Sequence, residues 1–105
     1  MNPQLKKGFL EYCVLVVLLK SDSYGYQIVK DTSEIIEITE STLYPILKRL
    51  EANKSLETYS IEHNGRLRKY YKITTIGKQH INDFLKEWDE VLVVYNFIRG
   101  SVEND

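Results

Sequence analysis

The 105-residue sequence predicts a mainly α-helical fold with a small β-hairpin and a long C-terminal helix. Three observations lead to this fold class. Apolar residues recur at helical spacing in four segments, an Asn-Gly pair separates two short alternating runs, and the last helical segment is the longest. The chain is long enough for one compact unit and too short for two domains that fold independently.

Composition limits the class of protein. The chain is 43% hydrophobic and 28% charged with two prolines, which favours a folded domain over disorder. The single cysteine, Cys13, excludes an intrachain disulfide and fits a reducing cytoplasm. The longest apolar stretch, Tyr12 to Leu19, is shorter than the roughly 20 residues of a membrane span, and no small-residue cleavage site follows it. We therefore expect a cytoplasmic protein with no membrane partner.

The basic residues are concentrated in one part of the chain. The net charge is −1, but the segment from Ser41 to Asn82 contains eight basic and three acidic residues, so it carries +5 and the remainder carries −6. No acidic residue occurs between His63 and Asn82. This asymmetry predicts a face that binds a polyanion, and a solvated basic surface is the alternative.

The first two helices follow from apolar spacing. The segment from Phe9 to Leu19 is apolar on nearly every side apart from Glu11, which predicts a central helix that is buried all round. A second helix is expected from about Tyr24 to Ile36. Three candidate N-caps precede it: Ser21, Asp22 and Ser23.

The third helix has the clearest pattern. Its apolar residues follow the i, i+3, i+4, i+7 rule: Leu43, Ile46, Leu47 and Leu50. Pro45 lacks an N–H and is best tolerated in a first turn, so regular helix should begin near Ser41 or Thr42, either of which can cap it. Asn53 is expected to end the helix in a left-handed conformation.

A β-hairpin should follow this helix. Asn64-Gly65 between two alternating runs is typical of a type I′ turn, in which both central residues have positive φ. The alternation predicts three inward residues: Ile61, Tyr71 and Ile73. The tip and the outer edge then carry the basic residues His63, Arg66, Arg68, Lys69 and Lys72.

A final helix is expected from just after Gly77 to about Arg99. Its wide apolar stripe contains Ile81, Phe84, Leu85, Trp88, Val91, Leu92, Tyr95 and Ile98. If four or five of these side chains stayed exposed, the loss would be on the order of 10 kcal/mol, which is the whole stability of a typical domain. A twofold partner packed against the same helix would bury them, so the stripe predicts an obligate homodimer.

The order of these elements predicts a winged helix-turn-helix over residues 1–75 and a dimerisation helix over residues 76–105. The second and third helices form the helix-turn-helix, and the hairpin is the wing. The polar face of the third helix would enter the major groove of double-stranded DNA, and a dimer would hold two such helices about 34–36 Å apart on an inverted repeat. The predicted DNA-binding residues are Ser41, Thr42, Tyr44, Pro45, Lys48, Arg49, Arg66, Arg68, Lys69 and Lys72.

Three stretches of the sequence resemble one known family. They are Tyr24-Gly25-Tyr26-Gln27-Ile28, then Ser41-Thr42-Leu43-Tyr44-Pro45-Ile46-Leu47-Lys48-Arg49-Leu50-Glu51, then Gly65-Arg66 followed by Arg68-Lys69-Tyr70-Tyr71-Lys72-Ile73-Thr74 and Gly77. Together they are similar to the PadR family of transcriptional regulators. The resemblance implies a winged helix-turn-helix repressor that dimerises through its last helix, in the short subgroup that includes multidrug-responsive members.

Two positions depart from the pattern of this family. The family usually has Gly in place of Ser41 and again in place of Lys54. Ser41 can still cap the helix, and its hydroxyl is expected to shift base preference without abolishing DNA binding. Asn53 tolerates positive φ, so we expect it to take the conformation that Gly provides in the family.

Trp88 is the centre of a predicted effector site. It lies on the predicted dimer seam, where two symmetry-related indoles could sandwich a planar aromatic or cationic molecule. A tryptophan at this place is similar to what multidrug-binding relatives use, and the first helix could complete the pocket with Phe9, Tyr12 and Cys13. The alternative is that Trp88 only fills the interface and that the other three residues pack in the core.

No pattern indicates an enzyme, a metal site or a cofactor. His63 and His80 lie on different predicted elements, and there is no phosphate-binding glycine loop. We expect His80 to be an ordinary surface residue and Cys13 to be a buried, unreactive thiol. The leading hypothesis is a DNA-binding repressor. The alternatives are a winged-helix module that binds a protein and not DNA, and a dimer that carries small molecules.

Overall fold

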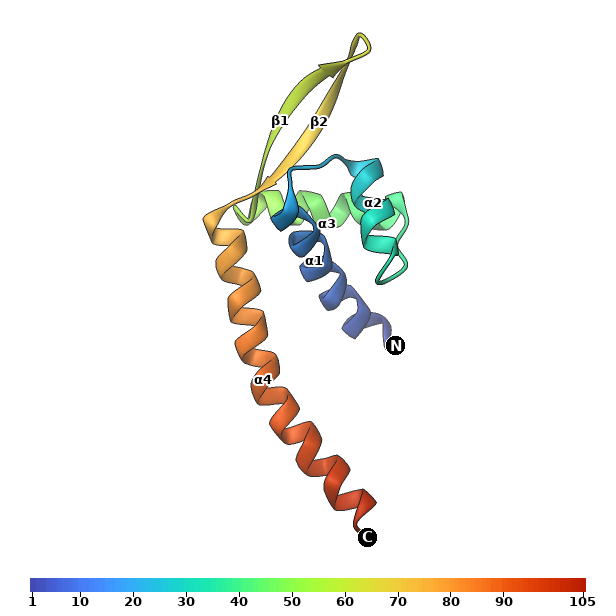
Figure 1. Ribbon diagram of the computed structural model, residues 1–105, viewed down its shortest axis with the longest axis vertical. Coiled ribbons are helices and arrows are strands. Elements are labelled where there is room, and N and C mark those ends of the chain that lie inside the picture. Colours follow the sequence, from blue (N-terminus) through green and yellow to red (C-terminus); the bar gives the residue numbers. More distant parts are fainter.

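The computed structural model describes residues 1–105 as four helices and one antiparallel hairpin (Figure 1). The elements are α1 (Pro3–Lys20), α2 (Gly25–Ser33), α3 (Glu40–Ala52), β1 (Leu56–His63), β2 (Arg66–Ile73) and α4 (Thr75–Glu103). The hairpin and α4 meet at one side of the body that α1, α2 and α3 form, and from there they project in opposite directions. The molecule is therefore elongated, at 65 × 26 × 21 Å. The predicted fold class is confirmed.

One apolar core joins α1, α2, α3, the base of the hairpin and the start of α4. The stripe of α3 is buried as predicted, and Tyr71 and Ile73 of β2 close the core from the hairpin side. The core consists of Leu10, Val14, Leu15, Leu18, Ile28, Ile38, Leu43, Ile46, Leu47, Leu50, Leu56, Tyr71, Ile73 and Ile81.

α1 is longer and less buried than the sequence predicts. The Oδ1 of Asn2 caps it by accepting the Gln4 N–H at 2.8 Å, and Pro3 opens the first turn. Val14 is fully buried, but Val16, on the other side of the helix, is 44% exposed. The expectation of a helix buried all round is wrong because no element of the chain covers the face of α1 that carries Val16 and Leu19.

α2 is shorter than predicted. It ends at Ser33, and Ile35 beyond it is 81% exposed. Tyr24 precedes its first turn without a side-chain cap, so the three candidate caps are wrong. Ser23 instead pairs with Tyr71 of β2 through two backbone hydrogen bonds of 3.2 and 2.8 Å, which hold the chain extended before the helix.

The ends of α3 differ from the prediction. The N-cap is Thr39, two residues before Ser41, and its hydroxyl accepts a backbone N–H of the first turn at 3.3 Å. Pro45 therefore lies in the second turn, and its missing N–H leaves the exposed Ser41 carbonyl without a helical partner. At the other end Lys54 has a φ of 69°, so the expectation that Asn53 takes the left-handed conformation is wrong. The Oδ1 of Asn53 instead accepts a backbone N–H two residues later, at 3.1 Å.

The hairpin turn has the predicted geometry, but one inward residue is wrong. Asn64 and Gly65 have φ of 52° and 78°, as a type I′ turn requires. Tyr71 and Ile73 are buried as expected, whereas Ile61 is 47% exposed.

The register of the hairpin explains the error. Leu56 pairs with Ile73 and Thr58 pairs with Tyr71, so these four side chains share the face toward the core. Ile61 lies three positions after Thr58 and therefore points to the opposite face. The two-residue turn sets this register, and the buried apolar residue of β1 is Leu56 at the base of the hairpin.

α4 is anchored at its N-terminal end. Thr74 caps it by accepting the Gly77 N–H at 3.1 Å, and a Cβ at Gly77 would come within 2.4 Å of the Ser55 carbonyl oxygen. His80 is not an ordinary surface residue, because its Nδ1 forms a 2.8 Å hydrogen bond with the hydroxyl of the fully buried Ser55. Ile81, predicted for the dimer seam, is the last buried residue of the helix and belongs to the core of its own chain.

The rest of α4 leaves the body and exposes large apolar side chains. They are Leu85, Val91, Leu92, Val93, Val94, Tyr95, Phe97, Ile98 and Val102. We call this segment, residues 85–103, the distal part of α4. None of the helices combines the length and the apolar character needed to cross a bilayer.

Candidate nucleic-acid interface

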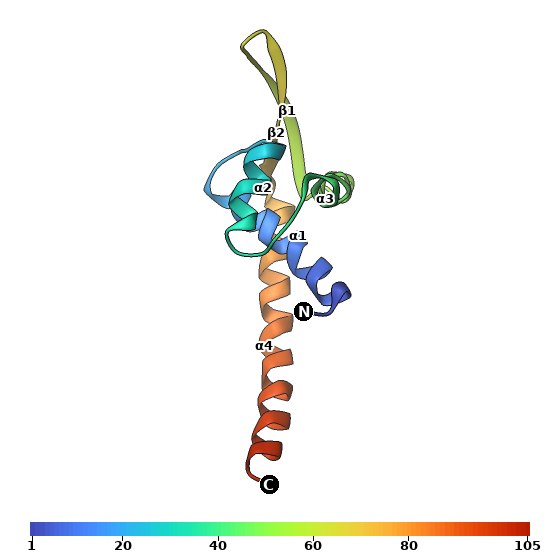
Figure 2. The same ribbon diagram turned by 90° about the vertical axis from the view of Figure 1, so that its right-hand side faces the viewer.

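The exposed face of α3 carries the side chains predicted to bind DNA. In Figure 2, α3 and the first turns of α1 lie on the same side of the molecule, and the hairpin extends beyond them. The six predicted residues of α3 are all exposed: Ser41, Thr42, Tyr44, Pro45, Lys48 and Arg49. They lie outside the core because the stripe of leucine and isoleucine takes the opposite side of the helix.

Three hydroxyl groups are linked at the start of α3. Thr39 Oγ1 donates to Thr42 Oγ1 at 3.1 Å and also lies 3.1 Å from Ser41 Oγ. Because Thr39 has a single hydroxyl proton, Ser41 is the donor in the second hydrogen bond. Thr42 therefore keeps a free O–H donor, whereas Ser41 presents lone pairs. In a major groove, the Ser41 acceptor suits the amino group of adenine or cytosine, and the Thr42 donor suits a phosphate or a base acceptor.

Tyr44 brings α3 next to the wing. Its hydroxyl lies over Gly25 at the start of α2, where a Cβ would approach it to 2.6 Å. Tyr44 also borders a hollow of about 520 Å³ together with Arg68 and Lys69 of β2. The fold thus brings three predicted DNA-binding residues from two elements to one depression.

An aromatic stack holds the wing against the loop between α1 and α2. The rings of Tyr59 and Tyr70 stack with centroids 5.6 Å apart, and Tyr24 meets Tyr70 edge-on at 5.5 Å. The guanidinium of Arg68 lies 4.1 Å above the Tyr24 ring in a cation–π contact. The Tyr59 hydroxyl donates to Asp22 at 2.6 Å, and this hydrogen bond, with smaller contributions from burial and the Asp22 charge, raises the pKa of Tyr59 to about 12. The stack fixes the place of Arg68 on the wing.

The basic side chains of α3 and the wing differ in their partners. Arg49 pairs with Glu11 of α1, so its guanidinium is directed to the α1 side of α3. Lys69 lies 3.7 Å from Glu51. No carboxylate lies within ion-pairing distance of Lys48, Arg66, Arg68 or Lys72. These four unpaired cations require no broken ion pair before they contact a phosphate.

The residues of the predicted effector site form an aromatic cluster between α1 and α4. The Tyr12 ring stacks on Phe84 with centroids 3.9 Å apart, and Trp88 lies 5.0 Å from Phe9. Phe84 and Trp88, predicted for the dimer seam, thus contact α1 of their own chain. Phe9, Tyr12 and Cys13 also border a groove of about 590 Å³ between α1, α2 and α4, which Trp88 does not line.

Tyr12 and Cys13 are two of the titratable residues that border this groove, and both stay protonated at neutral pH. Burial raises the pKa of the Cys13 thiol above its ordinary value, in the direction expected for an unreactive thiol. Burial is also the largest cause of the raised pKa of Tyr12, and the negative charges of Glu11, Glu87 and Asp83 add to it. Neither group brings a charge to the groove. No three His, Cys, Asp or Glu side chains lie together so as to hold a metal ion.

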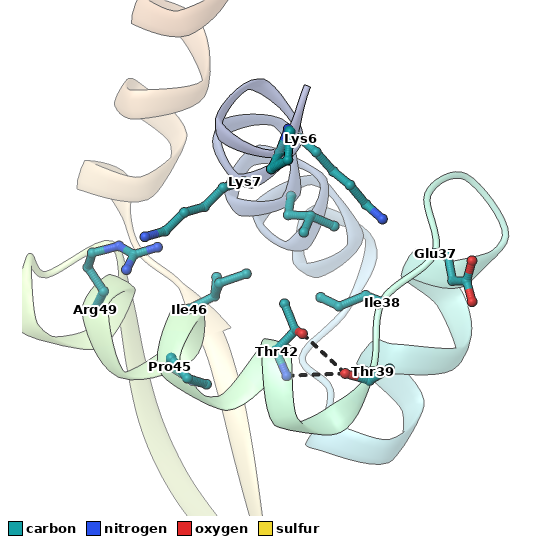
Figure 3. A pocket seen from close by; sticks show the side chains of 11 residues that line it. Lys6, Lys7, Glu37, Ile38, Thr39, Thr42, Pro45, Ile46 and Arg49 are labelled. Atoms are coloured by element: carbon teal, nitrogen blue, oxygen red, sulfur yellow. Dashed lines mark hydrogen bonds between the residues drawn. The ribbon is translucent and has the colours of Figure 1, made fainter. Parts of the chain in front are cut away.

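Sequence reasoning gave no site role to Lys6 and Lys7. Both lie in the first turns of α1 and border a groove beside α3 (Figure 3). The Asn2-Pro3 pair could have revealed them, because Asn followed by Pro marks a helix start well before Phe9.

The Tyr59–Asp22 hydrogen bond had no such local signal, since it joins residues 37 positions apart.

Comparison with known proteins identifies the family. The sequence model of the transcriptional regulator PadR-like family matches residues 14–83, from the middle of α1 to the first turns of α4. The chain belongs to the PadR-like family. The match includes α2, α3 and both strands of the wing, on which all ten predicted DNA-binding residues lie.

Three solved structures are similar to this PadR-like chain. A PadR-like transcription factor from Bacteroides fragilis is 35% identical with a TM-score of 0.80, over 90% of this chain and 94% of that one. A Streptococcus mutans protein is 46% identical with a TM-score of 0.72, over 85% and 84% of the two chains. Bacillus subtilis PadR in complex with operator DNA is 27% identical with a TM-score of 0.68, over 73% of this chain and 46% of that one. The PadR-like chain is therefore a DNA-binding transcriptional regulator and not an enzyme.

Proposed function

We propose that this PadR-like regulator is a homodimeric repressor that binds an inverted-repeat operator and releases it when a planar aromatic or cationic effector binds near Trp88. In this proposal residues 1–75 bind DNA and residues 76–105 join two protomers. The observation that carries it is the exposed distal part of α4, which contrasts with the complete core beneath α3.

The dimer is argued from the apolar surface of α4. Five residues of the predicted seam remain exposed in one chain: Leu85, Val91, Leu92, Tyr95 and Ile98. Burying each side chain contributes about 1.5–3 kcal/mol, so leaving the set in water is costly. A second copy presents the same stripe, and twofold symmetry lets each α4 cover the other. The exposed apolar face of α1 at Val16 and Leu19 adds a further surface for the partner.

DNA binding is argued from α3 and the wing. Ser41, Tyr44 and Lys48 have helical spacing on the exposed face of α3, so they would enter one major groove together. The unpaired wing residues Arg66 and Lys72 would neutralise neighbouring phosphates. A twofold dimer would hold two α3 helices about 34–36 Å apart, which suits two half-sites one helical turn apart.

Effector release is argued from the aromatic cluster. Phe9, Tyr12, Phe84 and Trp88 join α1 to α4 beside a groove of about 590 Å³, which is within the range of small-molecule sites. A flat ligand that separates these rings would change the angle between α1 and α4. Because α4 is the proposed dimer element, the spacing of the two α3 helices would change with it.

Selection of bound duplexes from a random pool tests the DNA-binding part. We expect recovered sequences with two inverted half-sites about 10–10.5 base pairs apart, and a dimer in sedimentation at the same protein concentration. The affinity should fall steeply with salt, because several phosphates are neutralised per dimer. A monomer, or a pool without a palindrome, would remove the proposal and favour a winged-helix module that binds a protein.

Intrinsic fluorescence tests the effector part separately. Trp88 is the single tryptophan of the chain, so its emission reports this cluster alone. Titration with planar aromatic cations should quench the emission and lower operator affinity in parallel. Trp88→Leu should still bind the operator, and the same compounds should no longer lower its operator affinity. If no compound of a varied panel changes the emission, Trp88 is a packing residue only.

A further inference from the structure

A second groove with basic residues lies beside α3. It is on the side of α3 away from the hollow that Tyr44 borders with Arg68 and Lys69. It encloses about 640 Å³ between the first turns of α1 and the exposed edge of α3. Its floor is apolar, and its rim carries Lys6, Lys7, Thr42, Pro45 and Arg49. Figure 3 shows Lys7 reaching toward Arg49 on one side of the groove and Lys6 reaching toward the link between α2 and α3 on the other.

The charge that this groove presents comes from two lysines. Neither Lys6 nor Lys7 lies within ion-pairing distance of a carboxylate, whereas Arg49 is already held by Glu11. Glu37 is the one acidic residue that borders the groove, and Figure 3 shows its carboxylate turned away from the other side chains. The rim therefore offers two free ammonium groups to an anion.

The groove also has a neutral donor. Thr42 Oγ1 accepts from Thr39, so its own proton is free to be donated, and Thr42 borders the groove between the two lysines. Ammonium groups and a hydroxyl donor are a typical set for a phosphodiester oxygen. Contacts from these groups would give no sequence specificity, because the phosphate is the same in every nucleotide.

We infer that this groove holds the DNA sugar-phosphate backbone next to the segment that α3 reads, with Lys6 and Lys7 neutralising phosphates and Thr42 donating to one. The inference rests on the proposed DNA binding and adds α1 as a third contact beside α3 and the wing. Figure 2 supports it, since the first turns of α1 and α3 lie on one side of the molecule. Arg49, held by Glu11, borders this backbone contact instead of extending to a guanine edge.

Paired lysine substitutions test the inference. Lys6→Ala with Lys7→Ala removes two charges per protomer, so the slope of log affinity against log salt should become shallower by about 0.9 for each phosphate that is no longer neutralised, or roughly 3.6 per dimer. The reduction in affinity should be equal for operator and for random duplex, because no base contact is removed. The matched control is Lys20→Ala with Lys30→Ala, which removes the same charge from exposed positions that do not border the groove.

Neutral phosphates locate the contact. An operator series with single methylphosphonates should contain positions at which wild-type affinity falls about tenfold and the Lys6, Lys7 double variant shows no further loss. If the double variant and the control have the same salt slope, or if every methylphosphonate affects wild type and double variant alike, the inference is overturned.

The two proposals fail in different ways. If wild type binds no palindromic duplex, the proposed function fails before the groove is tested. If wild type binds the operator and the double variant keeps full affinity, only the α1 contact fails, and the groove is then free for another anion such as an acidic peptide. An unchanged thermal midpoint in the double variant excludes misfolding as the cause of any loss.

Discussion

α3 and α4 have similar apolar stripes, yet the chain covers only one of them. Leu43 and Leu50, at the two ends of the α3 stripe, both lie in the core of a single protomer. α4 has two buried residues near its base, Gly77 and Ile81, and exposes apolar side chains along the rest of its length. The difference comes from the position of α4, which continues past the end of the body formed by the other helices (Figure 1). An apolar stripe thus predicts burial without saying which chain provides it.

The largest expected effect breaks the stripe of α4. Leu92→Asp removes an exposed leucine from the proposed seam and places a charge there in both protomers, so dimerisation should weaken by about 3–6 kcal/mol. Sedimentation at micromolar concentration should then show a monomer.

A charge change on the opposite side of α4 is the control. Lys86→Gln alters the net charge by the same amount, and the exposed Lys86 lies about 120° around the helix from Leu92, facing away from the middle of the stripe. It should leave the dimer intact. A Leu92→Asp protein that stays dimeric would show that the partner does not cover this stripe.

The next effect concerns the stripe of α3. Leu47 is 1% exposed, so Leu47→Ala leaves a cavity and should lower the free energy of unfolding by about 2–5 kcal/mol. Urea denaturation measures this loss. The midpoint should fall by a similar amount at low and high protein concentration, since the cavity lies within one protomer. A loss that appears only in the dimer would contradict the comparison of the two helices.

A smaller effect is expected where α4 joins the body. A Cβ at Gly77 would meet the Ser55 carbonyl oxygen at 2.4 Å, so Gly77→Ala should destabilise by about 1–3 kcal/mol. Gly100→Ala, in the same helix with nothing within 4 Å of the added Cβ, should be neutral or stabilise by about 0.5–1 kcal/mol. Thermal denaturation of the two variants compares an anchored end with a free one. Equal midpoints would show that the base of α4 adjusts freely.

The smallest effect depends on pH and concerns the wing. The pKa of Tyr59 is raised from 10.0 in the unfolded reference to about 12, chiefly by its hydrogen bond to Asp22. The folded chain therefore binds more protons between these values, and the stabilisation present below pH 10 is lost as pH rises through about 12. Tyr59→Phe should remove this alkaline loss and leave the stability profile flatter from pH 10 to 12. If both proteins have the same stability profile, the hydrogen bond between Tyr59 and Asp22 does not stabilise the wing.

Local patterns were enough to predict the helices and the turn, because they depend on neighbours in sequence. The stripe of α3 and the positive φ of Asn64 and Gly65 are of this kind. The exposed place of Ile61 was also within reach, since a two-residue turn fixes the register of both strands. The apolar alternation of Tyr59 and Ile61 marks the face of β1 opposite to the one that this register places toward the core.

Other features depend on residues distant in sequence and had no local signal. The direction of Arg49 is set by Glu11, 38 positions away, and the role of His80 is set by the buried hydroxyl of Ser55, 25 positions away. Ser23 does not take its predicted capping role because β2 offers it two backbone hydrogen bonds. For the predicted DNA-binding face, the sequence was enough to name the candidate residues. Only the tertiary contacts show which of these side chains lie side by side.

The anchoring of the hairpin has a consequence for the DNA as well. The hairpin is attached to the loop between α1 and α2 by the backbone bridge of Ser23 with Tyr71 and by the hydrogen bond of the Tyr59 hydroxyl to Asp22. These contacts oppose a swing of the wing relative to the helices. In the proposed complex the duplex would then have to adapt to the wing, so flexible pyrimidine–purine steps near the wing should favour complex formation even where no side chain touches a base.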